Sequence, residues 1–143
     1  MTELKDLENR LKKISNDDWD KLFRLIVEIE GSSSFGEMRG GDKNPDGTIN
    51  MPDINSAKIV DDFFDVSHKI GIIPIFDWTS WSEGKEIIND RETDYSKLDT
   101  VTLCKLLTVI IRADRFNDGF LVSCFKNGII LKILNGLKQN IYG

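Results

Sequence analysis

Apolar residues recur three and four positions apart along most of the chain, which is the spacing of one face of an α-helix. Short polar connections separate these stretches, so neighbouring helices are expected to pack against one another. The pattern predicts a mainly α fold, an orthogonal bundle of six or seven helices in one globular domain over residues 1–143. The helices are expected over residues 3–14, from a cap at residues 15–17 to about Glu30, and over 55–69, 80–89, 100–113, 120–126 and 129–141.

The predicted helix over residues 100–113 is apolar around nearly its whole circumference, and a helix of that kind is buried. It runs into the segment Arg112-Ala-Asp-Arg-Phe-Asn-Asp-Gly119, which we call the arginine corner. Arg112 and Arg115 can complement the negative end of the helix and pair with an aspartate of the corner. These charges are therefore expected where the core meets water.

Residues 31–53 break the helical pattern, because five of the eleven glycines and two of the three prolines lie there. This composition predicts a loop or a small β-hairpin at about residues 35–51. In the hairpin, Phe35–Arg39 would pair with Thr48–Met51, and Asn44-Pro-Asp-Gly47 would form the turn.

The same segment also resembles the calcium-binding loop of an EF-hand or a dockerin. Asp42, Asn44, Asp46 and Asp53 stand at loop positions 1, 3, 5 and 12, and Thr48 would offer its backbone carbonyl at position 7. Against calcium, an aspartate replaces the usual bidentate glutamate, two prolines interrupt the loop, and no helix leads into it. A polar hairpin without metal and a calcium site both remain open.

Two tryptophans follow the extended segment over residues 72–76. Asp77 or Thr79 can cap the helix over 80–89, and Trp78 and Trp81, three residues apart, are expected to share one helical face. The two rings either close the core or form a platform on which a ligand stacks.

Composition narrows the classes of function. With 40% hydrophobic and 30% charged residues the chain is an ordinary globular protein, and its net charge of -5 argues against a broad nucleic-acid-binding surface. Cys104 and Cys124 lie in apolar helical context and are expected to be buried free thiols. The polar N-terminal residues and the absence of a long apolar run predict a cytoplasmic protein with no signal peptide and no membrane span.

Three segments together resemble a known family. They are Phe76-Asp-Trp-Thr-Ser-Trp81, the arginine corner and Gly128-Ile-Ile-Leu-Lys-Ile-Leu134. The chain resembles, over about residues 35–137, a family of small bacterial proteins catalogued as domain of unknown function 6508. The resemblance implies no activity, but it implies that the Phe-Asp-Trp segment and the arginine corner belong together.

The first functional hypothesis is a non-catalytic binding or protein-interaction module. Its cleft would be lined by Trp78, Trp81, Arg112, Asp114 and Arg115, because arginine suits planar or anionic groups and tryptophan stacks on them. An unknown protein or a small anionic ligand would be the partner, and the chain would be a monomer or a homodimer. The same residues could also be a structural ion-pair corner.

Two alternatives use acidic residues. A carboxylate-based hydrolase would draw its acid and base from Asp77, Glu83, Asp114 and Asp118, since the chain has no nucleophile elbow, P-loop, zinc spacing or Rossmann fingerprint. A calcium-binding interaction module would use the loop at 42–53. A raised carboxylate pKa in a cleft would favour the enzyme, whereas an exposed aromatic patch would favour binding.

Overall fold

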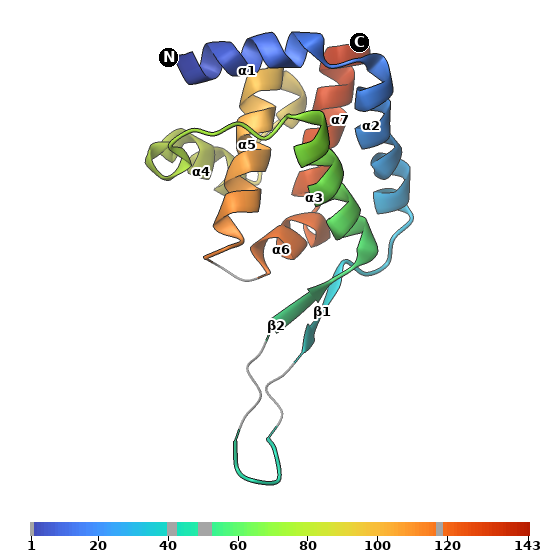
Figure 1. Ribbon diagram of the computed structural model, residues 1–143, viewed down its shortest axis with the longest axis vertical. Helices are drawn as coiled ribbons and strands as arrows, with labels where there is room; N and C mark the ends of the chain where they lie inside the picture. Colours follow the sequence, from blue (N-terminus) through green and yellow to red (C-terminus); the bar gives the residue numbers. More distant parts are fainter. Residues whose placement is uncertain (1, 40–42, 49–52, 117–118) are drawn as a thin grey trace.

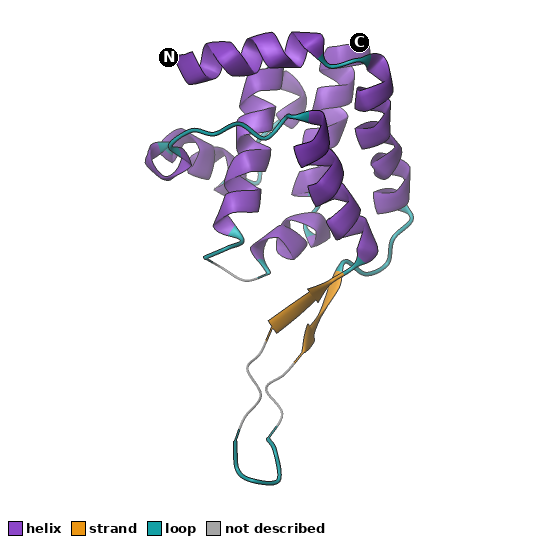
Figure 2. Cartoon of the chain, in the orientation of Figure 1, coloured by secondary structure: helices purple, strands orange, loops and turns teal. Residues whose placement is uncertain are grey.

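The computed structural model describes residues 2–39, 43–48, 53–116 and 119–143. This part of the chain forms seven α-helices and one pair of antiparallel strands, which confirms the predicted mainly α fold (Figures 1 and 2). The helices are α1 Thr2–Lys13, α2 Asn16–Glu30, α3 Lys58–Ile70, α4 Ser82–Asn89, α5 Thr100–Ala113, α6 Phe120–Lys126 and α7 Ile129–Tyr142. Two short 3₁₀ helices, η1 Trp78–Ser80 and η2 Tyr95–Lys97, flank α4 along the chain.

Helix α5 lies at the centre of the packing, as its all-round apolar sequence predicts. The side chains of Leu106, Leu107 and Ile110 are completely buried. Its N-terminus is fixed by Asp99, whose carboxylate accepts a hydrogen bond of 2.7 Å from the backbone N–H of Thr102. Helices α1, α4, α6 and α7 all contact it, so one cluster of buried apolar side chains joins most of the bundle.

Helices α6 and α7 meet at a sharp angle of 71°. Gly128 stands between them with a φ of 86°, a left-handed conformation that glycine adopts without steric cost. Among the described helices, none alone has the length and apolar character needed to cross a membrane, and only this bent pair meets that test when its two members are joined.

The strands pair in a register different from the predicted one. Strand β1, Gly36–Arg39, pairs with β2, Asp53–Ser56, so the predicted pairing with Thr48–Met51 is wrong; residues 49–52 lie outside the described residues. The predicted turn is confirmed, since the N–H of Gly47 donates to the carbonyl of Asn44 at 3.0 Å. Because β2 uses residues up to 56, α3 begins three residues later than predicted.

The base of the hairpin is attached to the helices by aromatic packing. The ring of Phe125 in α6 lies 5.4 Å from that of Phe35, just before β1, and 5.3 Å from that of Phe63 in α3. The N–H of Ala57 donates to the carbonyl of Phe35 at 2.9 Å, which continues the pairing of the two strands. Beyond this base the hairpin points away from the helical body (Figure 1).

Two aromatic side chains differ in their exposure to solvent. Phe64 of α3 is 37% exposed. Tyr95 of η2 is buried, because η2 packs closely against α7. A Cβ atom at Gly136 of α7 would lie only 2.9 Å from the carbonyl oxygen of Tyr95, so glycine permits this approach.

Both cysteines are buried free thiols, as predicted. Burial raises the pKa of Cys104 and that of Cys124 to about 12. A thiol with such a pKa is protonated at neutral pH, so neither cysteine provides a thiolate nucleophile.

Candidate interaction groove

A groove of about 240 Å³ lies between α4 and the C-terminal half of α5. The α4 wall presents Lys85, Ile88 and Asn89, which are three and four residues apart and therefore share one helical face. Val109 and Ala113 form the α5 wall by the same spacing. Trp78 of η1 and Phe120 of α6 complete the lining, which is mostly apolar.

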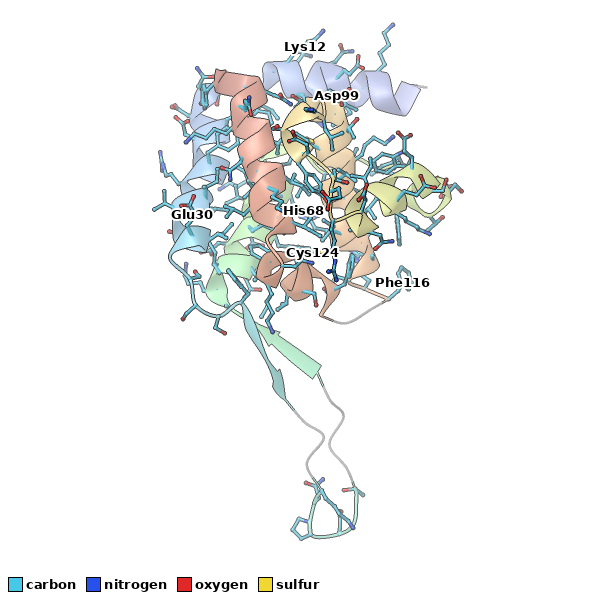
Figure 3. The ribbon with its side chains drawn as sticks, turned by 180° about the vertical axis from the view of Figure 1, so that it is seen from behind. Lys12, Glu30, His68, Asp99, Phe116 and Cys124 are labelled. Carbon is cyan, nitrogen blue, oxygen red and sulfur yellow. The ribbon has the colours of Figure 1, made fainter. Side chains whose placement is uncertain are left out.

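The edge of the groove carries an exposed aromatic side chain. Phe116, in the turn after α5, is 83% exposed, and its ring centroid lies 6.2 Å from that of Trp78. Figure 3 shows Phe116 at the outer edge of the molecule, directed away from the helical body. The Phe-Asp-Trp segment and the arginine corner are thus in contact, as the family resemblance implied.

Positive charge flanks the apolar lining. Lys85 stands on the α4 wall, and Arg112, half-buried, follows Val109 by three residues and so shares its face of α5. The ion pairs in the described part of the chain join other residues, Lys21 with Asp18 and Lys58 with Asp62.

The acids of α4 lie away from the groove wall. By helical spacing, Glu83 and Glu86 fall on faces of α4 other than the one that presents Lys85 and Ile88. No acidic side chain is among the residues that line the groove, as far as the structure describes the chain.

Trp78 is positioned by a turn that Asp77 organises. The hydroxyls of Ser80 and Thr79 each donate a hydrogen bond of 2.7 Å to the Asp77 carboxylate. These bonds from Ser80 and Thr79 hold the pKa of Asp77 below its ordinary value. A carboxylate stabilised in its charged form is a poor general acid, so Asp77 is better explained as the residue that shapes η1.

The two tryptophans do not share a helical face, contrary to the sequence-based expectation. Helix α4 begins at Ser82, after both of them, and Trp81 turns toward α5. There the Lys105 ammonium lies 4.1 Å from the Trp81 ring centroid, a cation–π contact. A Cβ atom at Gly84 would lie 2.4 Å from the Trp81 ring, so this glycine makes room for it. Trp81 therefore joins α4 to α5 and is not part of the groove lining.

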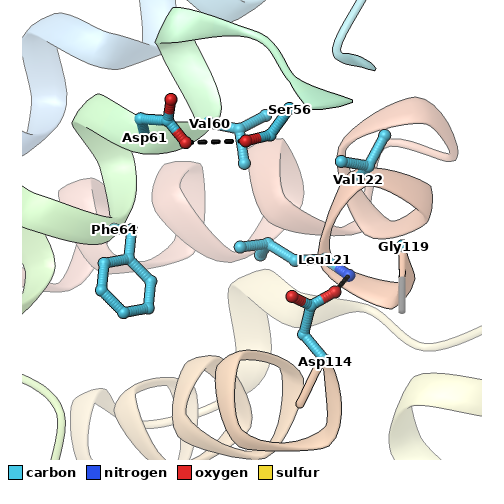
Figure 4. A pocket seen from close by; sticks show the side chains of 8 residues that line it. All are labelled: Ser56, Val60, Asp61, Phe64, Asp114, Gly119, Leu121 and Val122. Atoms are coloured by element: carbon cyan, nitrogen blue, oxygen red, sulfur yellow. Dashed lines mark hydrogen bonds between the residues drawn. The ribbon is translucent and has the colours of Figure 1, made fainter. Parts of the chain in front are cut away.

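Asp114 faces a different pocket, of about 270 Å³ (Figure 4). Its carboxylate accepts a hydrogen bond of 3.0 Å from the N–H of Leu121, in the first turn of α6. Across this pocket Asp61 accepts a hydrogen bond of 2.7 Å from the hydroxyl of Ser56. The structure thus separates Asp114 from Trp78, and Arg115 is exposed at the surface. Asp118, the other acid expected to pair with the arginines, lies outside the described residues.

Sequence reasoning selected only part of the groove. Trp78 lines it and Arg112 flanks it, whereas Trp81, Asp114 and Arg115 lie elsewhere. The residues that were missed are Lys85, Ile88, Asn89, Val109, Ala113, Phe116 and Phe120. The spacing of Lys85, Ile88 and Asn89 could have indicated the α4 wall from the sequence, because it places a cation beside an apolar side chain on one face of a short helix.

The calcium-like loop is only partly described. Asp42 and the side chain of Asp53 lie outside the described residues. In the described part, the Asp46 carboxylate accepts hydrogen bonds from the N–H and the hydroxyl of Thr48, at 3.0 and 2.6 Å, and Asn44 donates to that hydroxyl at 2.9 Å. The pKa of Asp46 is lowered by these bonds from Thr48. The Asp46 carboxylate and the Thr48 hydroxyl are therefore already engaged in a polar turn.

We expect calcium to leave the melting temperature of metal-stripped protein within about 1 °C of its starting value, because the turn is satisfied by its own hydrogen bonds. Binding at a hundredfold excess over the dissociation constant would add about 2.7 kcal/mol, which is a rise of several degrees in a domain of this size. The melt is run with calcium, with magnesium and with chelator. A rise selective for calcium and abolished in Asp46→Ala would contradict this expectation.

The comparisons with known proteins define the chain as a member of a family. A family model described as Family of unknown function (DUF6508) matches residues 14–142. The chain belongs to this family, and the match covers nearly its whole length. No curated protein and no solved structure matches the chain.

Proposed function

We propose that the protein is a non-catalytic interaction module that binds another protein through the groove between α4 and α5. The observation that supports this most is the exposed Phe116 packed on Trp78 at the edge of an apolar groove. Large exposed aromatic side chains beside apolar clefts are typical of interfaces, where tryptophan and phenylalanine are enriched.

The size of the groove favours a peptide side chain over a cofactor. At about 240 Å³ it falls below the ~300–1,000 Å³ of typical small-molecule sites. A single large apolar side chain, inserted beside Trp78 and covered by Phe116, is the occupant that such a volume suits. In protein–protein interfaces, a few large side chains buried in pockets carry most of the binding free energy.

The hydrolase alternative receives less support from the same geometry. Asp77 is held in its charged form by Ser80 and Thr79, and Asp114 is bound to the start of α6. The two carboxylates also belong to different parts of the surface, because Asp114 lines the pocket shared with Asp61. An acid and a base must act on one substrate bond, and these two are not arranged to do so.

The groove can be tested with displayed heptapeptides selected on the wild-type protein. We expect the selected peptides to share a large apolar residue and to bind Trp78→Ala about tenfold more weakly, since aromatic anchors dominate such interfaces. Phe116→Ser should weaken them as well, and because Phe116 is 83% exposed, this variant tests the site without disturbing the core. Affinities are measured by fluorescence anisotropy.

Val27→Ser is the matched control, because Val27 is an apolar residue of α2 that is 75% exposed. Helices α2 and α4 lie on opposite sides of the body in Figure 1. Peptides that bind Trp78→Ala and Phe116→Ser as tightly as the wild type, or a selection that enriches no peptide, would overturn the proposal.

A further inference from the structure

Resting on the proposed function, we infer that the groove recognises an acidic segment of its partner, one in which a large apolar residue is flanked by carboxylates. The groove combines a mostly apolar lining with one lining cation, Lys85 of α4, and Arg112 of α5 flanks this lining. The apolar lining would bind the large apolar residue of the partner, and the cations would pair with the carboxylates on either side of that residue.

The arrangement of the cations carries this inference. Lys85 stands on the α4 wall one turn from Ile88, and Arg112 lies on α5 three residues after Val109, beside the lined part of that wall. An extended peptide that placed its anchor between the walls would carry its neighbouring side chains toward these two cations. Arginine can hold a carboxylate through two parallel hydrogen bonds, and lysine provides a compact charge.

The rest of the site does not neutralise these cations. Neither of them belongs to the ion pairs found in the described part of the chain, and the acids of α4 lie on its other faces. An acidic partner would therefore supply charges that the groove itself lacks. The whole chain has a net charge of -5, but at physiological salt charges more than ~8 Å away are largely screened, so the local cations dominate.

Three acetylated, amidated pentapeptides test the inference as probes. The first has a phenylalanine flanked by two glutamates, the second has glutamines in place of the glutamates, and the third keeps the glutamates but has serine in place of phenylalanine. Binding is followed by the chemical shift of the Trp78 indole N–H in ¹⁵N-labelled protein. We expect the first peptide to bind about fivefold more tightly than the second at low salt, and the third to bind weakest.

Charge variants separate the roles of the two cations and the anchor. Lys85→Gln and Arg112→Gln should each reduce the affinity for the glutamate peptide about threefold and leave that for the glutamine peptide unchanged. Lys12→Gln is the matched control, since Lys12 is an exposed lysine of α1 at the top of the view in Figure 3, whereas Phe116 lies at the lower right of the helical body.

The outcomes distinguish this inference from the proposed function. Equal binding of the glutamate and glutamine peptides, with both weakened by Phe116→Ser, would overturn the acidic partner and keep the groove. Equal binding of the peptide that lacks the anchor would also overturn it and indicate a site for small anions. A glutamate preference that is insensitive to Phe116→Ser would overturn the groove itself, and so would the absence of binding by all three peptides.

Discussion

Replacing Phe63 by alanine is expected to lower the free energy of unfolding by about 3–5 kcal/mol, the range found when a buried phenylalanine is truncated. Phe63 is completely buried, and its ring meets the edge of Phe125 at 5.3 Å. Truncation therefore removes apolar burial, leaves a cavity beside α6 and deprives Phe125 of one of its two aromatic neighbours. Phe35, the other neighbour, would then pack against a Phe125 ring that is held less firmly.

The measurement is chemical denaturation followed by far-ultraviolet circular dichroism. Phe64→Ala is the matched control, because it removes the same side chain from the next position of α3, where 37% of the surface is exposed. We expect it to cost less than about 1 kcal/mol, as for most surface substitutions. Similar losses in the two variants would show that α3 does not pack in the way described.

Gly136→Ala is expected to destabilise the protein by about 2 kcal/mol, although alanine is intrinsically the better helix former by about 1 kcal/mol. The added methyl group would lie 2.9 Å from the carbonyl oxygen of Tyr95 and 3.2 Å from a methyl carbon of Leu103. The nearer atom belongs to the backbone, so relief requires η2 to move away from α7. Such a movement would also loosen the burial of Tyr95.

Asn135→Ala provides the comparison, since Asn135 is exposed on the same helix and one position away. Helix propensity alone should make that variant slightly more stable than the wild type. If η2 approaches Gly136 as closely as described, thermal melts of the two variants therefore show shifts of the melting temperature that are opposite in sign. A rise in melting temperature for both would count against the close approach of η2.

The helices were predictable because their apolar spacing is a local property of the sequence. The bounds of α5 and α6 agree with the pattern. Gly71 ends α3 in a left-handed conformation, and Gly128, also left-handed, separates α6 from α7. The hairpin register was not predictable in this way. Turn residues located the turn at Asn44–Gly47, but the described pairing lies at the distant base, where contact between Phe35 and Phe125 in α6 helps to hold it.

The site was harder to predict than the fold, because its walls come from separate helices. Trp78 and the arginine corner were recognised as related from sequence, yet only the packing of α4 on α5 shows that Lys85 joins them. The same packing separates Trp81 from Trp78, since Trp81 is drawn toward Lys105. Spacing within one helix says which residues share a face, but not which neighbouring element that face meets.

The hairpin has a consequence for the cooperativity of unfolding. Its strands pack chiefly on each other, and their link to the core is the base formed by Phe35 and Ala57. Local opening of the strand pairing therefore exposes little of the apolar surface that stabilises the helices, and it requires much less free energy than global unfolding. Amide protons of β1 and β2 can exchange with solvent through this opening while those of α5 remain protected, so the chain contains two regions of very different local stability.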